Sequence, residues 1–189
     1  MRMQPAARRS HVREGTAGPE IVIPARRNWI VILLLPLWLG VWSMGIAGVI
    51  RHAFIDGRPP GAETRLLAFW LAAAAVGLAG AVYTWLWNAV GREIVAVRPG
   101  VLAIRRDVAG LGRTREYDLV DVKNLRVSPA PSGPFGGKAS MHFWLGGPGI
   151  IAFDYGARTV RFADGIDEAE APMVLAEIGG GSRFERPAA

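Results

Sequence analysis

Two long stretches of the chain lack charged residues and are apolar all round. The first runs from Trp29 to Ile50 and the second from Leu66 to Gly91. As a helix rising about 1.5 Å per residue, each is long enough to cross roughly 30 Å of hydrocarbon. A helix on the surface of a soluble protein shows a polar face at helical spacing, and neither stretch shows one. The pattern predicts transmembrane helices over 29–50 and 66–91.

The segment between them, residues 51–65, is short and contains Gly57, Pro59, Pro60 and Gly61, which favour a turn. The two helices are therefore expected to be antiparallel neighbours. Small residues in both helices would permit close packing, but such residues are also common in membrane helices generally, so both interpretations stay open. These residues are Gly40, Gly45, Gly48, Ala73, Gly77 and Ala81.

Arginines are concentrated outside the hairpin. Six precede the first helix against two glutamates, whereas the loop holds only Arg51, Arg58 and Arg65. Because Lys and Arg accumulate on the cytoplasmic side of a bilayer, we expect a multi-pass protein of the cell inner membrane with both termini in the cytoplasm. Residues 1–28 are predicted to be a disordered basic tail. Within it, Ile21–Ile23 are a candidate for a short strand that pairs with the soluble domain.

From Arg92 onward the pattern changes to alternation of period two, which is typical of half-buried strands. A loop is expected at 129–137, a C-terminal helix at 166–178 with Asp164 or Asp167 as its N-cap, and a flexible tail at 181–189. Pro172 marks either a kink or a late start of that helix. A bulge or short turn is expected near Asp121. Seven strands are predicted, at 93–97, 101–106, 113–119, 122–127, 140–145, 150–155 and 159–162.

The predicted fold is thus a membrane α-hairpin followed, over 92–180, by a mainly β domain closed by one helix. A hydrophobic hairpin, the strand opening Glu93-Ile94-Val95, its partner 101–104 and the final 154–162 hairpin before a helix together resemble the bacterial pleckstrin-homology-like membrane proteins. The resemblance covers roughly residues 25–180 and implies a bent sheet or barrel of about seven antiparallel strands capped by the C-terminal helix. A small OB-type barrel is the alternative, which the terminal position of the helix disfavours.

Charge and chemistry narrow the functional classes. The chain of 189 residues carries a net charge of +6, which next to two apolar stretches indicates anionic lipid rather than nucleic acid. The absence of cysteine excludes disulfides and thiolate chemistry. His11, His52 and His142 lack metal-ligand spacing. The acidic residues between Asp164 and Glu170 lie at the start of a predicted helix, where helix capping and solvation account for their presence. We expect no enzymatic activity, cofactor or metal.

Basic residues in the predicted strands form the one candidate binding site. If the strands pair as predicted, several of these residues share the turn-side rim of the sheet, where they would bind lipid headgroups or an acidic partner. The alternative is that they are ordinary exposed strand positions. The candidate residues are Arg105, Arg106, Arg113, Arg115, Lys123 and Arg126.

These observations favour a membrane-anchored adaptor or assembly factor whose pleckstrin-like domain binds a protein partner. A sensor of anionic lipid surfaces and an accessory subunit of a membrane transporter or enzyme complex are the alternatives. Neither apolar stretch holds a charged residue, which disfavours the subunit hypothesis. Besides the bilayer, a protein partner is expected, no nucleic acid is expected, and a homo-oligomer stays open.

Overall fold

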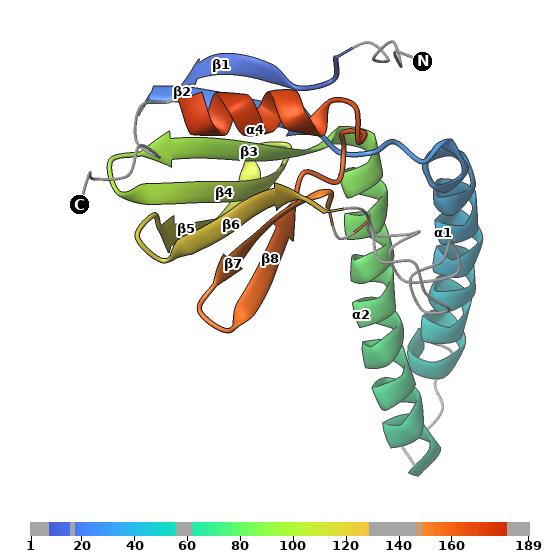
Figure 1. Ribbon diagram of the computed structural model, residues 1–189. Coiled ribbons are helices and arrows are strands. Elements are labelled where there is room, and N and C mark those ends of the chain that lie inside the picture. The colour runs from blue at the N-terminus through green and yellow to red at the C-terminus, as the bar shows by residue number, and fades with distance from the viewer. Residues whose placement is uncertain (1–7, 16–17, 56–61, 129–146, 148, 181–189) are drawn as a thin grey trace. The chain divides into compact units, whose positions relative to one another are not determined.

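The computed structural model describes residues 8–15, 18–55, 62–128, 147 and 149–180. The chain divides into two compact units (Figure 1). The helical unit spans Asn28–Ala89, and the β unit combines Met1–Arg27 with Val90–Ala189.

The helical unit begins with α1 (Trp29–Ile50), whose bounds are those the apolar pattern predicts. The helix starts at Trp29 because the side chain of Asn28 accepts hydrogen bonds from the backbone N–H groups of Ile30, at 3.1 Å, and Val31, at 3.5 Å. These bonds satisfy donors that have no partner within the first turn.

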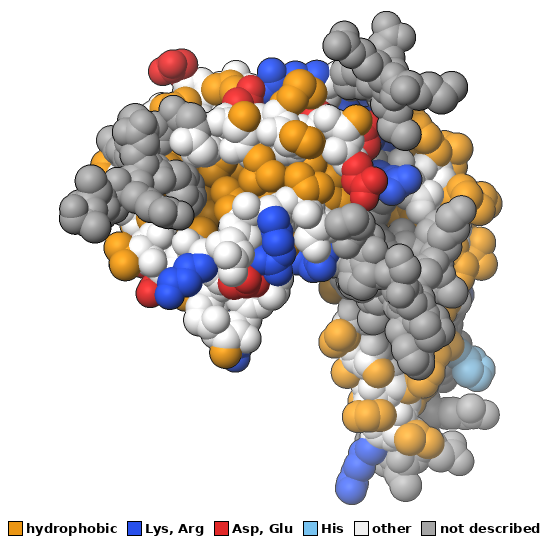
Figure 2. Space-filling view, in the orientation of Figure 1, with side chains coloured by type: hydrophobic (Ala, Val, Ile, Leu, Met, Phe, Trp, Pro, Cys, Tyr) orange, Lys and Arg blue, Asp and Glu red, His pale blue; other side chains and the backbone are white. Residues whose placement is uncertain are grey.

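The second helix, α2 (Ala62–Val90), starts four residues earlier than predicted and ends one residue earlier. The predicted loop 51–65 is correspondingly shorter, because Arg51–Ile55 continue α1 as a π-helical turn, η1. The four Gly and Pro residues of the predicted turn lie outside the described residues. Trp29–Ile50 and Arg65–Val90 are each long and apolar enough to cross a membrane. Only 11% and 6% of these spans are buried, and Figure 2 shows hydrophobic side chains over their visible surface.

A hydrogen bond from a tryptophan of α2 to a backbone carbonyl of α1 connects the two helices, next to a proline of α1. Pro36 lies inside α1 and has no backbone N–H, so the carbonyl of Ile32 lacks its usual donor four residues later. The indole Nε1 of Trp85 in α2 donates to that carbonyl at 3.1 Å. A backbone carbonyl in an apolar environment needs a partner, so this bond makes the proline compatible with a membrane helix.

Of the four glycines suggested to allow close packing of the helices, Gly77 alone lies against a side chain of the partner helix. The ring of Trp42 lies over Gly77, where an added Cβ would be 3.5 Å from the indole. An added Cβ at Gly40, Gly45 or Gly48 would meet no atom of the partner helix within 4 Å. Trp38 stacks on Trp42 with ring centroids 4.9 Å apart.

The β unit contains two antiparallel sheets. The first has the order β1-β2-β3-β4-β5 and the second the order β6-β7-β8. Their strands are β1 (His11–Gly15), β2 (Gly18–Pro24), β3 (Gly91–Arg98), β4 (Val101–Val108), β5 (Leu111–Asp118), β6 (Val122–Val127), β7 (Ile151–Tyr155) and β8 (Arg158–Phe162). Six of these confirm predicted strands, with ends shifted by at most two residues. The predicted strand 140–145 lies outside the described residues.

The first two strands correct the prediction of a disordered tail for residues 11–15 and 18–24 of the segment 1–28. His11–Gly15 and Gly18–Pro24 form a hairpin, and β2 pairs with β3 from Glu20↔Ala96 to Pro24↔Arg92. The suggested strand at Ile21–Ile23 is confirmed, and its three side chains are buried. The composition of the segment is that of a tail, but pairing with β3 supplies the burial that the segment cannot obtain alone.

One hydrophobic core joins both sheets and the C-terminal helix. Strands of both sheets and α4 (Ala171–Gly180) contribute buried side chains, among them Ile23, Leu102, Phe153, Phe162 and Val174. Tyr117 of β5 contacts Phe153 of β7 edge to face at a centroid distance of 5.1 Å, so aromatic contacts bridge the sheets.

The C-terminal helix starts late, at Ala171, with Pro172 in its first turn, where a missing N–H costs nothing. Asp167 precedes it, and its Oδ1 accepts from the N–H of Glu170 at 2.9 Å. Glu170 is 2% exposed. Its Oε1 accepts from the N–H groups of Arg9 and Ser10 and from Ser10 Oγ, at 3.0, 2.7 and 2.5 Å. Glu170, directly before the helix, therefore also holds the N-terminal segment in place through these hydrogen bonds.

Candidate functional site

The two faces of the five-stranded sheet differ in chemistry. On β3, Val95 and Val97 belong to the core face, where Val95 is opposite Ile104 and Val97 is opposite Leu102. The intervening residues of β3 lie on the opposite face, because successive side chains of a strand alternate. We call this second surface the outer face.

The outer face carries a hollow of about 270 Å³ that spans strands β1 to β5. Its charged lining comprises four arginines and two carboxylates. We call it the arginine hollow, and its lining residues are Arg13, Glu20, Arg92, Ile94, Ala96, Arg98, Ala103, Arg105, Asp107, Gly110 and Thr114.

The floor of the arginine hollow is apolar. Ile94, Ala96 and Ala103 are all less than 9% exposed, although they lie on the face opposite the core. Long arginine side chains cover such surface with their aliphatic stems and keep the guanidinium groups in water. The site therefore combines a small-residue apolar floor with cationic groups around it.

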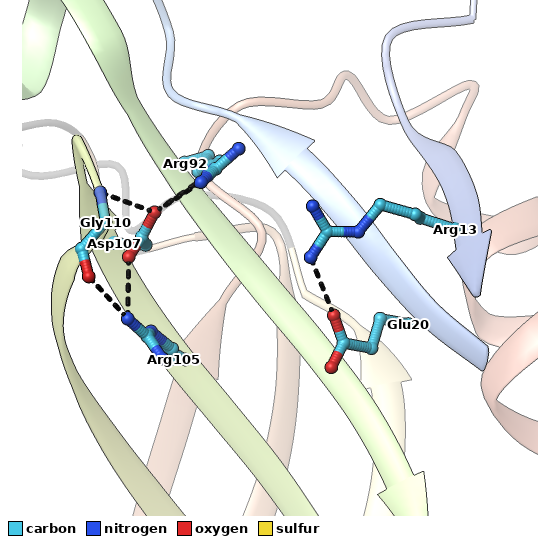
Figure 3. Close-up of polar contacts among 6 residues, drawn as sticks. All are labelled: Arg13, Glu20, Arg92, Arg105, Asp107 and Gly110. Carbon is cyan, nitrogen blue, oxygen red and sulfur yellow. Dashed lines mark hydrogen bonds and ion pairs between the residues drawn. The ribbon is translucent and has the colours of Figure 1, made fainter. Parts of the chain in front are cut away.

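Asp107 anchors two of the four arginines (Figure 3). Its side chain is 1% exposed, and its carboxylate accepts from Arg92 Nε at 2.8 Å and from Arg105 Nη2 at 2.9 Å. The backbone N–H of Gly110 donates to the same carboxylate at 3.3 Å. Burial acts to raise the pKa of Asp107, but the hydrogen bonds from Arg92 and Arg105 outweigh it and lower the pKa below its ordinary value.

The turn between β4 and β5 completes this arrangement. Ala109 and Gly110 both have positive φ, 52° and 90°, as in the two-residue hairpin turns that match strand twist. The carbonyl of Gly110 accepts from Arg105 Nη2 at 2.8 Å. Gly112 is opposite Asp107, and a Cβ there would be 2.4 Å from the carbonyl oxygen of Arg106 and 2.9 Å from Arg105 Nε. Gly112 thus provides the room that the Arg105 side chain occupies.

Arg13 and Glu20 form the other edge of the hollow. They are opposite each other in the β1–β2 pair, and Arg13 Nη2 lies 3.1 Å from Glu20 Oε2 (Figure 3). The glutamate side chain lies over Gly15, where a Cβ would be within 2.3 Å of its carboxylate carbon. Arg98 is held more loosely, with Nη1 at 3.7 Å from Glu116 Oε1. Within the described residues, the Nε donors of Arg98 and Arg105 are buried without a hydrogen-bond partner.

Several of the six candidate basic residues were expected to share one rim of the sheet, but the six are divided between the two faces of the first sheet and strand β6 of the second sheet. Arg105 belongs to the arginine hollow, but Arg106, its neighbour in β4, belongs to the core face. There its Nε donates to Glu93 Oε1 at 2.9 Å. Arg113 and Arg115 of β5 are opposite Arg106 and Ile104, so both lie on the face away from the hollow, and both are exposed.

Lys123 and Arg126 lie on β6 of the other sheet. Arg126 forms a two-pronged ion pair with Asp154, at 2.9 and 3.2 Å. Hydrogen bonds from Arg126, Asn124 and Thr159 lower the pKa of Asp154 to about 2. The bulge or short turn expected near Asp121 is confirmed as a turn, in which the N–H of Asp121 donates to the carbonyl of Asp118 at 3.1 Å. A register shift follows between Lys123 and Arg126, where Asn124 has φ 51°.

Sequence reasoning missed three of the four arginines of the hollow. Arg92 and Arg98 flank the alternating strand 93–97, and their even spacing with Ile94 and Ala96 was a signal that they share one face. Adjacent residues of a strand point to opposite faces, so Arg105 and Arg106 are separated by the same rule. Arg13 carried no such signal, because its strand was not expected.

A second polar cluster lies on the core side. Glu93 is 3% exposed, and its Oε2 accepts from the N–H of Ala163 at 2.7 Å. Nearby, Asp164 Oδ1 accepts from the N–H of Gly147 at 2.6 Å, and Oδ2 is buried without a partner within the described residues. Burial raises the pKa of Asp164 and the charge of Glu93 raises it further, against the opposing effects of the Gly147 N–H, Arg106 and Arg26. Of the two predicted N-cap residues, Asp164 bonds to Gly147 instead, and Asp167 accepts from the N–H of Glu170 before the C-terminal helix.

Across the part of the chain that the structure describes, no group of three or more His, Asp or Glu side chains could hold a metal ion. Comparison of the chain with protein-family models, curated proteins and solved structures gave no match.

Proposed function

We propose that this chain is a non-enzymatic membrane-anchored adaptor whose β unit has a pleckstrin-homology-like fold and binds a protein partner at the cytoplasmic face of the inner membrane. The observation that carries the proposal is that the β unit connects directly to the start of α1 and to the end of α2, two apolar helices whose side chains are mostly exposed. β2 ends at Pro24 and α1 starts at Trp29, whereas α2 ends at Val90 and β3 starts at Gly91.

Strand pairing ties these two connections together. The antiparallel β2–β3 pair extends to Pro24↔Arg92, and the N–H of Ala25 donates to the carbonyl of Gly91 at 2.9 Å. The chain therefore enters α1 and leaves α2 at the same place. A hairpin that spans a bilayer with its ends joined in this way has both ends, and hence the β unit, on one side. The excess of arginine before α1 favours the cytoplasmic side.

The chemistry of the described residues supports an adaptor better than a transport or enzyme subunit. Thr84 and Asn88, two polar side chains of α2, donate to backbone carbonyls of their own helix, at 2.9 Å to Gly80 and 2.8 Å to Thr84. Both side chains are uncharged and bond within their own helix, whereas functional sites inside a membrane usually use ionisable groups. The β unit instead offers charged sheet faces, which suit recognition of a partner.

A sensor of anionic lipid surfaces is the second candidate. Arg113 and Arg115 on β5 and Lys123 on β6 are exposed cations. Each basic residue close to an anionic surface contributes about 1 kcal/mol of attraction. This candidate requires no protein partner, and an experiment in membranes separates the two.

The test is site-specific cross-linking in native membranes. A photoreactive amino acid replaces Thr114 on the outer face, and in a second variant Val120 in the exposed β5–β6 turn. The adaptor proposal predicts one discrete protein adduct that recurs in replicate membranes. Cross-linking to lipid alone from both positions contradicts it and favours the lipid sensor.

A further inference from the structure

We infer that the arginine hollow is the binding site for an acidic segment of the partner protein, whose carboxylates insert between the arginines of the outer face. This inference rests on the adaptor function proposed above and names the site and the chemistry of the partner. The first support is the local charge, because four arginines against two carboxylates in the lining leave a net charge of +2.

The spacing of the arginines favours an extended ligand over a single anion. Arg13 on β1 and Arg105 on β4 are three strand spacings apart, which is about 14 Å. Arg92 and Arg98 are six residues apart on one strand, which is about 20 Å. One phosphate group contacts only neighbouring members of such an array, whereas a peptide with several acidic side chains reaches all of it.

The arginines keep donors for a ligand. A guanidinium has five N–H groups, and the contacts of Arg13 and Arg98 each involve a single terminal nitrogen. Exposed ion pairs such as Arg98–Glu116 are weak, so an incoming carboxylate can share or replace them at small cost. Asp107 meanwhile holds Arg92 and Arg105 in fixed positions, which lowers the entropy lost on binding.

The carboxylates of the hollow favour a peptide over a lipid surface. Glu20 and Asp107 lie among the arginines and would repel a continuous layer of anionic headgroups. Acidic side chains on a peptide backbone can occupy the positions between these carboxylates. The apolar floor of Ile94, Ala96 and Ala103 also suits the aliphatic stems of glutamate side chains.

The experiment uses the full chain in nanodiscs of neutral phosphatidylcholine and a fluorescein-labelled decapeptide of alternating glutamate and alanine. The test variant is Arg13→Gln with Arg98→Gln, which leaves the Asp107 cluster intact. The matched control is Arg113→Gln with Arg115→Gln, which removes the same charge from the opposite face. We expect the test variant to bind the peptide roughly 5- to 30-fold more weakly, because two guanidinium contacts with the peptide are lost. The control is expected to bind within about two-fold of the wild type.

Glu20→Gln provides an opposite test that misfolding cannot imitate, because it raises the charge of the hollow and is expected to strengthen peptide binding. Equal losses in the two double variants, or no binding of the peptide by the wild type, overturn the inference. So does binding to nanodiscs with anionic phosphatidylglycerol, but not to the peptide, that depends on Arg13 and Arg98. If the cross-linked partner of the native membrane persists in the Arg13/Arg98 variant, the adaptor function stands and only the assignment of its site fails.

Discussion

Arg92 and Asp107 are directly opposite each other in the β3–β4 pair, and Arg92 Nε donates to Asp107 Oδ2 at 2.8 Å. Asp107 is nearly inaccessible, whereas the Arg92 side chain is 39% exposed. The acceptor is thus fixed within the sheet and the donor reaches into the arginine hollow. Buried carboxylates that hold exposed guanidinium groups in this way pre-organise a cationic surface.

Replacing Asp107 by alanine is expected to lower the free energy of unfolding by about 1–3 kcal/mol, because Arg92, Arg105 and the Gly110 N–H lose their shared acceptor. The lowered pKa of Asp107 fixes the pH dependence. A depressed carboxyl pKa stabilises the fold above its unfolded value of about 3.9, and this contribution is lost as the pH falls through the folded pKa. Thermal unfolding in detergent, followed by circular dichroism, measures the difference. An unchanged midpoint at pH 7 contradicts the anchoring role.

Asp164→Asn is expected to stabilise the protein at pH 7 by up to about 1 kcal/mol. Burial and the charge of Glu93 raise the pKa of Asp164, so its ionisation opposes folding. The stability contributed by the protonated form is present below the unfolded pKa and is lost as the pH rises through the folded pKa. The asparagine keeps an acceptor for the Gly147 N–H. The advantage of the variant should therefore be absent below about pH 4. Destabilisation at pH 7 would show that the negative charge is needed.

The Trp85–Ile32 hydrogen bond is testable by a double-mutant cycle. Trp85→Phe leaves the Ile32 carbonyl without its indole donor, and we expect a loss of about 1 kcal/mol in helix association. Pro36→Ala restores the backbone donor that Ile32 lacks, so the same tryptophan substitution should cost less in that background. Thermal unfolding of the four proteins in detergent gives the coupling energy. Additive effects would mean that proline and tryptophan act independently.

Glu170→Ala is expected to release the N-terminal segment, because one carboxylate oxygen accepts from three donors of Arg9 and Ser10. Limited proteolysis should cleave the variant N-terminal to β2 faster than the wild type, with a loss of about 1–3 kcal/mol in stability. Glu168→Ala is the matched control, since its side chain is exposed. Equal cleavage rates in both variants contradict the assigned role.

The parts of the fold that depend on local pattern were predictable. Trp29–Ile50 is apolar throughout and long enough to cross a membrane, and the strands from Glu93 onward alternate clearly. His11–Gly15 could not be predicted, because it contains one aliphatic residue and becomes a strand only by pairing with β2. The early start of α2 at Ala62 was not predicted, because the charged Glu63 and Arg65 lie outside the apolar stretch, although both are good helix formers.

The candidate site was only partly predictable for the same reason. Alternation along β3 and β4 separates Arg105 from Arg106 and places Arg92 and Arg98 on one face. It does not show that a buried carboxylate would hold two of these arginines together, because Arg92 and Asp107 meet only through the register of a strand pair. The contribution of Arg13 depends on a hairpin that tail-like composition concealed.

The central claim is that an apolar hairpin crosses the membrane and leaves the β unit on the cytoplasmic side. Because the chain has no cysteine, single cysteines can be placed without background. The most direct measurement labels Leu111→Cys, an 83% exposed position of β5, and Arg58→Cys, between the two helices, with a membrane-impermeant maleimide. In intact cells from which any outer membrane has been removed, only the Arg58→Cys variant should react, and in inverted membrane vesicles only the Leu111→Cys variant. Labelling of both positions from one side, or release of the protein by alkaline carbonate, would contradict the account.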